Sequence, residues 1–153
     1  MRVILGLALF TMSPLLLSGA EPDPFLGKWK LNWDKSHSLS SAPKSAVRKY
    51  SKSGDGVHVS ETWIDLSGKH QQVNYKANYD GRDYPVPTSK GHTVAFTKTD
   101  PFTVEGVSKS DGKVDYTFRR MVSSDRKTLT IELAKRDASG APASEVLVYD
   151  KVK

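Results

Sequence analysis

The chain has 153 residues, a formal net charge of +6 and no cysteine. The absence of cysteine excludes a disulfide-stapled fold and a lipid-modified N-terminal cysteine. A positive charge can attract nucleic acid, but lysine and arginine are scattered, with no run longer than two, so we expect no nucleic-acid binding.

The first residues have the three parts of a secretory signal peptide. Arg2 gives a basic start, the stretch from Val3 to Leu17 is largely apolar, and Ser18-Gly19-Ala20 offers small residues for cleavage. The apolar stretch is shorter than the roughly 20 residues that cross a bilayer. We therefore expect a signal peptide over residues 1–20, cleavage near Ala20, a secreted or periplasmic product without stable membrane insertion, and one domain over residues 21–153.

From residue 21 onward, short segments of alternating, β-branched and aromatic residues recur between turn residues at intervals of roughly 8 to 12. This spacing is typical of an antiparallel sandwich or barrel. The serine-rich segment 34–44 is predicted to be a loop with room for one helical turn. The expected strands lie near residues 27–33, 45–52, 57–65, 70–79, 82–86, 93–99, 102–109, 114–122, 128–135 and 145–151.

The turns of the first half predict a strand register, because a slip of one residue would turn each apolar face outward. Pairing Lys52 with Val57 places Arg48 beside Glu61. Pairing Leu66 with His70 then places Glu61 beside Tyr75. One face is expected to hold these two charged residues together with Tyr50, Val57, Val59, Trp63, Val73, Tyr75, Ala77 and Tyr79.

In the second half, Asp111-Gly112 is a strong signal for a type I′ hairpin. A regular hairpin there places Val107 beside Tyr116 and Glu105 beside Phe118, which makes Glu61 and Glu105 the acids of the inner face. Placing Ser123 opposite Thr128 sets Arg120 beside Ile131. The pattern leaves open whether Arg119 or Arg120 points inward.

Three stretches carry a resemblance to a known superfamily. Phe25-Leu26-Gly27-Lys28-Trp29-Lys30-Leu31 contains a Gly-x-Trp first strand, Val146 to Val152 forms a closing strand, and an Asp111-Gly112-Lys113 hairpin precedes Arg119-Arg120. Together they resemble the calycin superfamily, which includes the lipocalins and the intracellular fatty-acid-binding proteins. The resemblance implies an all-β fold, an antiparallel up-and-down β-barrel of about 8–10 strands, with Trp29 packed at its base.

The chain departs from fatty-acid-binding proteins in two ways. Segment 34–44 lacks the amphipathic period of their helical lid. The Arg-x-Tyr of their last strand is represented by Leu147-Val148-Tyr149, so only Tyr149 corresponds.

No arrangement typical of catalysis or of a metal site is found in the sequence. There is no Gly-x-Ser-x-Gly, and the four histidines, His37, His58, His70 and His92, fall on an outer face, at a hairpin end or in loops. We therefore expect no catalytic residues, no metal and no cofactor, and an enzyme is the least favoured class.

The leading hypothesis is an exported, non-catalytic protein that carries a small hydrophobic or amphipathic molecule in a barrel cavity, because inward charges are costly in a dry core and tolerable in a wet one. In the alternative, the aromatic side chains fill the interior, and the outer surface binds or inhibits an envelope protein. The predicted ligand-binding residues are Arg48, Tyr50, Glu61, Trp63, Tyr75, Tyr79, Tyr116, Phe118, Arg120 and, through the resemblance, Tyr149.

Overall fold

A computed structural model describes residues 21–38, 43–136 and 139–153. The predicted signal peptide, residues 1–20, lies outside the described residues. Within them the chain is all-β, as predicted, with one turn of 3-10 helix (Trp33–Lys35) that begins at the last residue of the predicted strand 27–33 and enters the segment 34–44 predicted as a loop. The strands are β1 (Gly27–Leu31), β2 (Ser45–Ser53), β3 (Gly56–Ile64), β4 (His70–Asn78), β5 (Tyr84–Pro85), β6 (His92–Asp100), β7 (Thr103–Ser110), β8 (Lys113–Val122), β9 (Thr128–Arg136) and β10 (Pro142–Val152).

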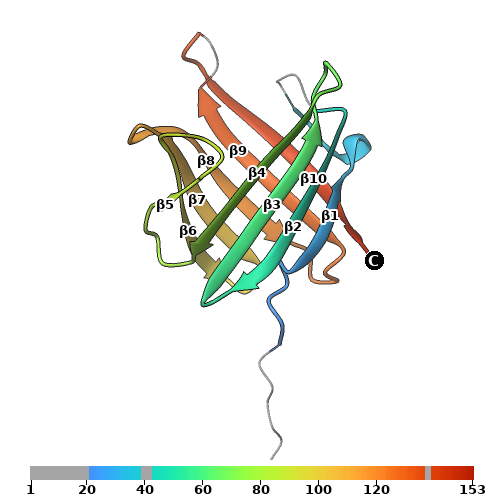
Figure 1. Ribbon diagram of the computed structural model, residues 1–153. Helices are drawn as coiled ribbons and strands as arrows, with labels where there is room; N and C mark the ends of the chain where they lie inside the picture. Colours follow the sequence, from blue (N-terminus) through green and yellow to red (C-terminus); the bar gives the residue numbers. More distant parts are fainter. Residues whose placement is uncertain (1–20, 39–42, 137–138) are drawn as a thin grey trace, which may run out of the picture.

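The strands form one antiparallel sheet in the order β4-β3-β2-β1-β10-β9-β8-β7-β6-β5 (Figure 1). The sheet curls into a nearly closed barrel. Its two end strands are β4 and β5, and the residues that follow β4 reach β6, the neighbour of β5. There the Gly81 amide donates to the Phe96 carbonyl at 2.7 Å, and Asp80 forms an isolated bridge with Thr97. No helix among the described residues has the length and hydropathy to cross a membrane.

The end of the barrel that holds the β2–β3 turn, the lower end in Figure 1, is sealed by the N-terminal segment. Phe25 and Trp29 are fully buried there, and the Trp29 indole Nε1 donates to the Phe25 carbonyl at 2.9 Å. The Phe25 ring meets Tyr50 edge-on, with ring centroids 6.2 Å apart. Trp29 therefore packs at the base of the barrel, as expected.

The opposite, upper end is less tightly closed. Along each strand alternate residues point inward, and those in the lower half, such as Val59 and Leu129, are fully buried. Inward apolar residues of the upper half are only partly buried, and these are Trp63, Val73, Tyr116, Leu133 and Leu147. The interior, which we call the well, is thus packed tightly below and is more exposed above.

Two of the predicted registers hold residue for residue. Arg48 lies opposite Glu61 in the β2–β3 pair, and Arg120 lies opposite Ile131 in the β8–β9 pair. The predicted β3–β4 register is wrong by two residues, since Ile64 rather than Leu66 faces His70. A wider turn closed by the Asp65 amide and the Lys69 carbonyl, 3.0 Å apart, accounts for this difference. A shift of two preserves the predicted inner face.

The predicted β7–β8 register is wrong by one residue. A register shift between Ser108 and Lys109 inserts one extra residue, which is the effect of a β-bulge. Phe118 therefore faces Gly106, and Glu105 faces Arg119 on the outside of the barrel. Glu105 is exposed and does not belong to the inner face.

Candidate functional site: a polar cluster inside the barrel

A partly buried ion pair lies in one wall of the well. Arg48 on β2 and Glu61 on β3 are direct cross-strand partners, and an Arg48 Nη2 donates to Glu61 Oε2. The Tyr149 hydroxyl donates to the other carboxylate oxygen at 3.1 Å, and Arg48 Nη1 donates to the Tyr50 hydroxyl at 3.3 Å. Burial and the neighbouring Glu61 carboxylate raise the pKa of Tyr149 far above its usual range. Tyr149 therefore stays protonated and neutral, and Glu61 supplies the negative charge that balances Arg48.

A second guanidinium lies close by without such a partner. Arg120 on β8 is 5% exposed, and its Nη2 donates to the Tyr75 hydroxyl at 3.0 Å. Its guanidinium carbon lies 4.3 Å from the centre of the Phe118 ring and 4.7 Å from that of Phe96. Among the described residues no carboxylate lies within ion-pair distance of Arg120, and its buried Nε has no hydrogen-bond partner.

We refer to Arg48, Tyr50, Glu61, Tyr75, Arg120 and Tyr149 as the inner polar cluster. Two guanidiniums share it with one carboxylate, so the cluster carries one net positive charge. Burial alone would lower the pKa of Arg120, but the surrounding tyrosine hydroxyls outweigh it and raise that pKa above its usual value. The cluster is therefore permanently cationic.

The remaining predicted residues lie around this cluster. Phe118 packs against Arg120, while Trp63 and Tyr116 are partly buried towards the upper end. Tyr79 lies at the base, where its hydroxyl contacts the Asp23 carboxylate at 3.3 Å. Burial, and then Asp23, raise the pKa of Tyr79. Tyr79 thus belongs to the closure of the base rather than to the cluster.

Sequence reasoning missed two parts of the interior. Phe96 is fully buried and its ring lies 5.9 Å from that of Tyr75 and 5.5 Å from that of Phe118. The alternation of Val94 and Phe96 within the predicted strand 93–99 carried this signal.

Near the upper end, Glu145 is buried and pairs with Lys135, and it also accepts a hydrogen bond from the Ser38 hydroxyl at 2.8 Å. Glu145, not Glu105, joins Glu61 as an inward acid.

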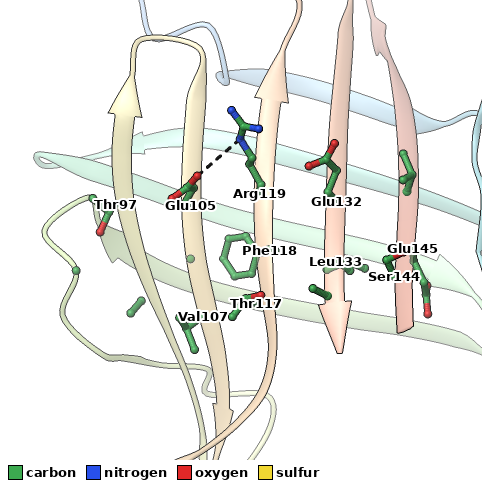
Figure 2. Close-up of a pocket in the computed structure, with 15 residues that line it drawn as sticks. Thr97, Glu105, Val107, Thr117, Phe118, Arg119, Glu132, Leu133, Ser144 and Glu145 are labelled. Atoms are coloured by element: carbon green, nitrogen blue, oxygen red, sulfur yellow. Dashed lines mark ion pairs between the residues drawn. The ribbon is translucent and has the colours of Figure 1, made fainter. Parts of the chain in front are cut away.

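A hollow of about 820 Å³ lies on the outside of the barrel, across β6 to β10. Figure 2 shows Glu105, Arg119 and Glu132 projecting from three neighbouring strands along it. Arg119 Nε lies 3.7 Å from Glu105 Oε1, and Arg119 is also the cross-strand partner of Glu132. Arg119 thus lies between two acids, and the three residues together carry one net negative charge. Arg119 is exposed, which resolves the open choice in favour of Arg120 as the inward arginine.

The structure also brings Ser110, His92 and Asp115 together at the surface. The Ser110 hydroxyl donates to Asp115 and lies about equally far from both ring nitrogens of His92, at 3.2 and 3.3 Å. A nucleophilic serine must instead give its proton to the histidine, which the acid orients from the other side. The three residues therefore do not form a proton relay. No group of three or more histidines and acids that could hold a metal occurs within residues 21–38, 43–136 and 139–153.

The fold can be compared with known proteins. The sequence matches no protein-family model and no curated protein. A point mutant of the fluorescent protein UnaG superposes with a TM-score of 0.58 at 22% identity, over 85% of this chain and 97% of that one. Wild-type UnaG superposes with a TM-score of 0.55 at 20% identity, over 84% and 97%. This likeness confirms the barrel fold that the resemblance to the calycin superfamily implies.

Proposed function

We propose that the chain is an exported, non-catalytic binding protein that holds one small amphipathic anion inside its barrel. The observation that carries this proposal is Arg120, a buried cation with no anion beside it. An isolated buried charge is costly, whereas a ligand carboxylate or similar group beside the guanidinium would form a strong, charge-assisted hydrogen bond. We therefore place the charged end of the proposed ligand at Arg120.

The well supplies the other half of the site. The inward side chains of Tyr116, Leu133 and Leu147 are only partly buried. Apolar walls with a few placed polar groups are typical of small-molecule sites. An alkyl or aromatic tail would lie along these residues, and the Phe96 and Phe118 rings would turn to admit it.

Export rests on the predicted signal peptide, and we propose a secreted or periplasmic location on that basis. The alternative is a filled barrel whose outer surface binds an envelope protein. The hollow across β6 to β10 favours it, as does the close contact of the Phe96 and Phe118 rings with Arg120.

Dodecanoate and dodecanol distinguish these two functions, because they share a tail and differ in charge. We expect the protein to bind dodecanoate in calorimetry, and Arg120→Gln to weaken that binding by about 10- to 100-fold with little change for dodecanol. Arg119→Gln is the matched control, since it removes the same charge from the adjacent, outward position. If neither ligand binds, or if both variants weaken dodecanoate equally, the interior is not the site.

A further inference from the structure

One side of the barrel exterior is formed by β1 to β4 (Figure 1) and carries an unusual set of charges. Four lysines of this side point outward and are exposed, namely Lys28, Lys30, Lys49 and Lys76. We call these four residues the lysine face. They alternate with the inward residues Trp29, Arg48 and Tyr75, so their orientation follows from the strand geometry.

Two of these lysines are forced together by the register. Lys28 on β1 and Lys49 on β2 are direct cross-strand partners, and Lys30 lies one outward position further along β1. Like charges placed directly opposite one another destabilise a sheet. Packing within the sheet offers no reason for this choice of residues.

The lysine face also lacks counter-charges. None of its four lysines takes part in an ion pair within the described part of the chain. Asp150, the cross-strand partner of Lys30 on β10, is engaged by the side chains of Asn32 and Lys35 at 2.6 and 2.9 Å. The opposite side differs, because Arg119 lies there between two acids, Glu105 and Glu132.

The residues between the lysines indicate the kind of surface that fits. The outward positions next to them on β2, β3 and β4 are mostly small and polar, such as Ser51, Ser60 and Asn74. On β1 to β4 no arginine points outward for bidentate phosphate recognition, and the outward rings are the imidazoles of His58 and His70, which offer a base less stacking area than phenyl or indole rings. The face is therefore a set of lysine point charges with few of the groups that read a nucleic acid.

We infer that the lysine face docks the barrel on an anionic phospholipid bilayer, as a peripheral electrostatic contact. Each lysine near such a surface strengthens binding by roughly fivefold at low salt. The contact lies outside the barrel and does not depend on whether the interior holds a ligand.

Vesicle co-sedimentation tests this inference with the purified protein. We expect binding to phosphatidylcholine vesicles that contain phosphatidylglycerol, release by added salt, and no binding to pure phosphatidylcholine. Lys28→Gln with Lys49→Gln should weaken binding by roughly 30-fold. The matched control is Lys90→Gln with Lys113→Gln, two exposed lysines near the upper end of β6 to β8, which removes the same net charge.

The inference is overturned if the two double variants weaken binding equally, since net charge alone would then explain it. It is also overturned if the wild-type protein ignores anionic vesicles, or if it binds duplex DNA more tightly than vesicles at the same salt. Arg120→Gln should bind vesicles like the wild type, so failure of the interior site and failure of the lysine face are separable.

Discussion

Tyr75 on β4 and Arg120 on β8 meet inside the barrel through a hydrogen bond of 3.0 Å from the guanidinium to the hydroxyl. This bond holds the one guanidinium of the inner polar cluster that has no carboxylate partner. Tyr75 therefore fixes the position of the proposed anion site.

Removing this hydrogen bond should cost stability. In Tyr75→Phe, Arg120 remains buried and loses a partner, which costs about 1–3 kcal/mol of the free energy of unfolding. Urea unfolding measures it. Tyr116→Phe is the control, because the described residues give its hydroxyl no hydrogen-bond partner, and it should change the same free energy by less than about 0.5 kcal/mol. Equal losses in the two variants would show that the hydrogen bond between Arg120 and Tyr75 does not contribute to the free energy of unfolding.

The Arg48–Glu61 pair should be far more sensitive to removal of one partner than of both. Glu61→Gln leaves a second uncompensated guanidinium in the cluster, and we expect a loss of about 3–5 kcal/mol. Replacing the pair by Arg48→Met with Glu61→Leu should recover most of this loss, since apolar residues of similar volume need no counter-charge. A double variant less stable than Glu61→Gln in urea unfolding would contradict this account.

Gly106 should be required for the position of the Phe118 ring. A Cβ at residue 106 would lie 2.3 Å from Phe118 Cζ and 2.5 Å from the Ala95 carbonyl oxygen. Gly106→Ala must displace the ring that covers Arg120, and overpacking of this kind costs about 1–3 kcal/mol. Thermal unfolding measures the loss, and near-ultraviolet circular dichroism should report the altered aromatic packing. Unchanged spectra and stability would mean that Phe118 does not rest on Gly106.

Stability should fall in alkali. Burial raises the pKa of Tyr75, Tyr79 and Tyr149 above their usual value of about 10. The folded protein thus keeps protons that the unfolded chain loses. The contribution of these tyrosines to the free energy of unfolding is fully present below about pH 10. It decreases as the pH rises further, by up to about 1.4 kcal/mol per pH unit for each tyrosine.

Urea unfolding across this range checks the sign, and Tyr79→Phe should show a smaller decrease per pH unit than the wild type. Tyrosinate absorbance offers a second check. Ionisation of all tyrosines together near pH 10, with the barrel still folded, would refute the raised pKa values.

Much of the fold follows from local sequence rules. Alternating residues and turn signals predict the ten strands, because both depend on neighbours within a few positions. The short Gly54-Asp55 turn also fixes the β2–β3 register, which brings Arg48 and Glu61 together in sequence reasoning. A local turn thus determines a partly buried ion pair.

Other features depend on information that local patterns lack. The bulge makes Asp115 of β8 an extra residue between Val114 and Tyr116, the partners of Lys109 and Ser108. The Val-Asp-Tyr alternation reads as a regular strand, so hydropathy does not mark the bulge, which turns Glu105 outward. The isolation of Arg120 depends on every strand around the well. The pairing of Lys28 with Lys49 connects strands on either side of a loop whose length does not set a register.

The central claim is that Arg120 receives an anion inside the barrel. It is tested most directly by NMR titration of dodecanoate labelled at its carboxyl carbon and bound to the protein. The account predicts that the pKa of the bound carboxyl lies well below that of the free acid, and that Arg120→Gln removes this depression while Arg119→Gln preserves it. A bound carboxyl that titrates like the free acid, or equally in both variants, would contradict the account.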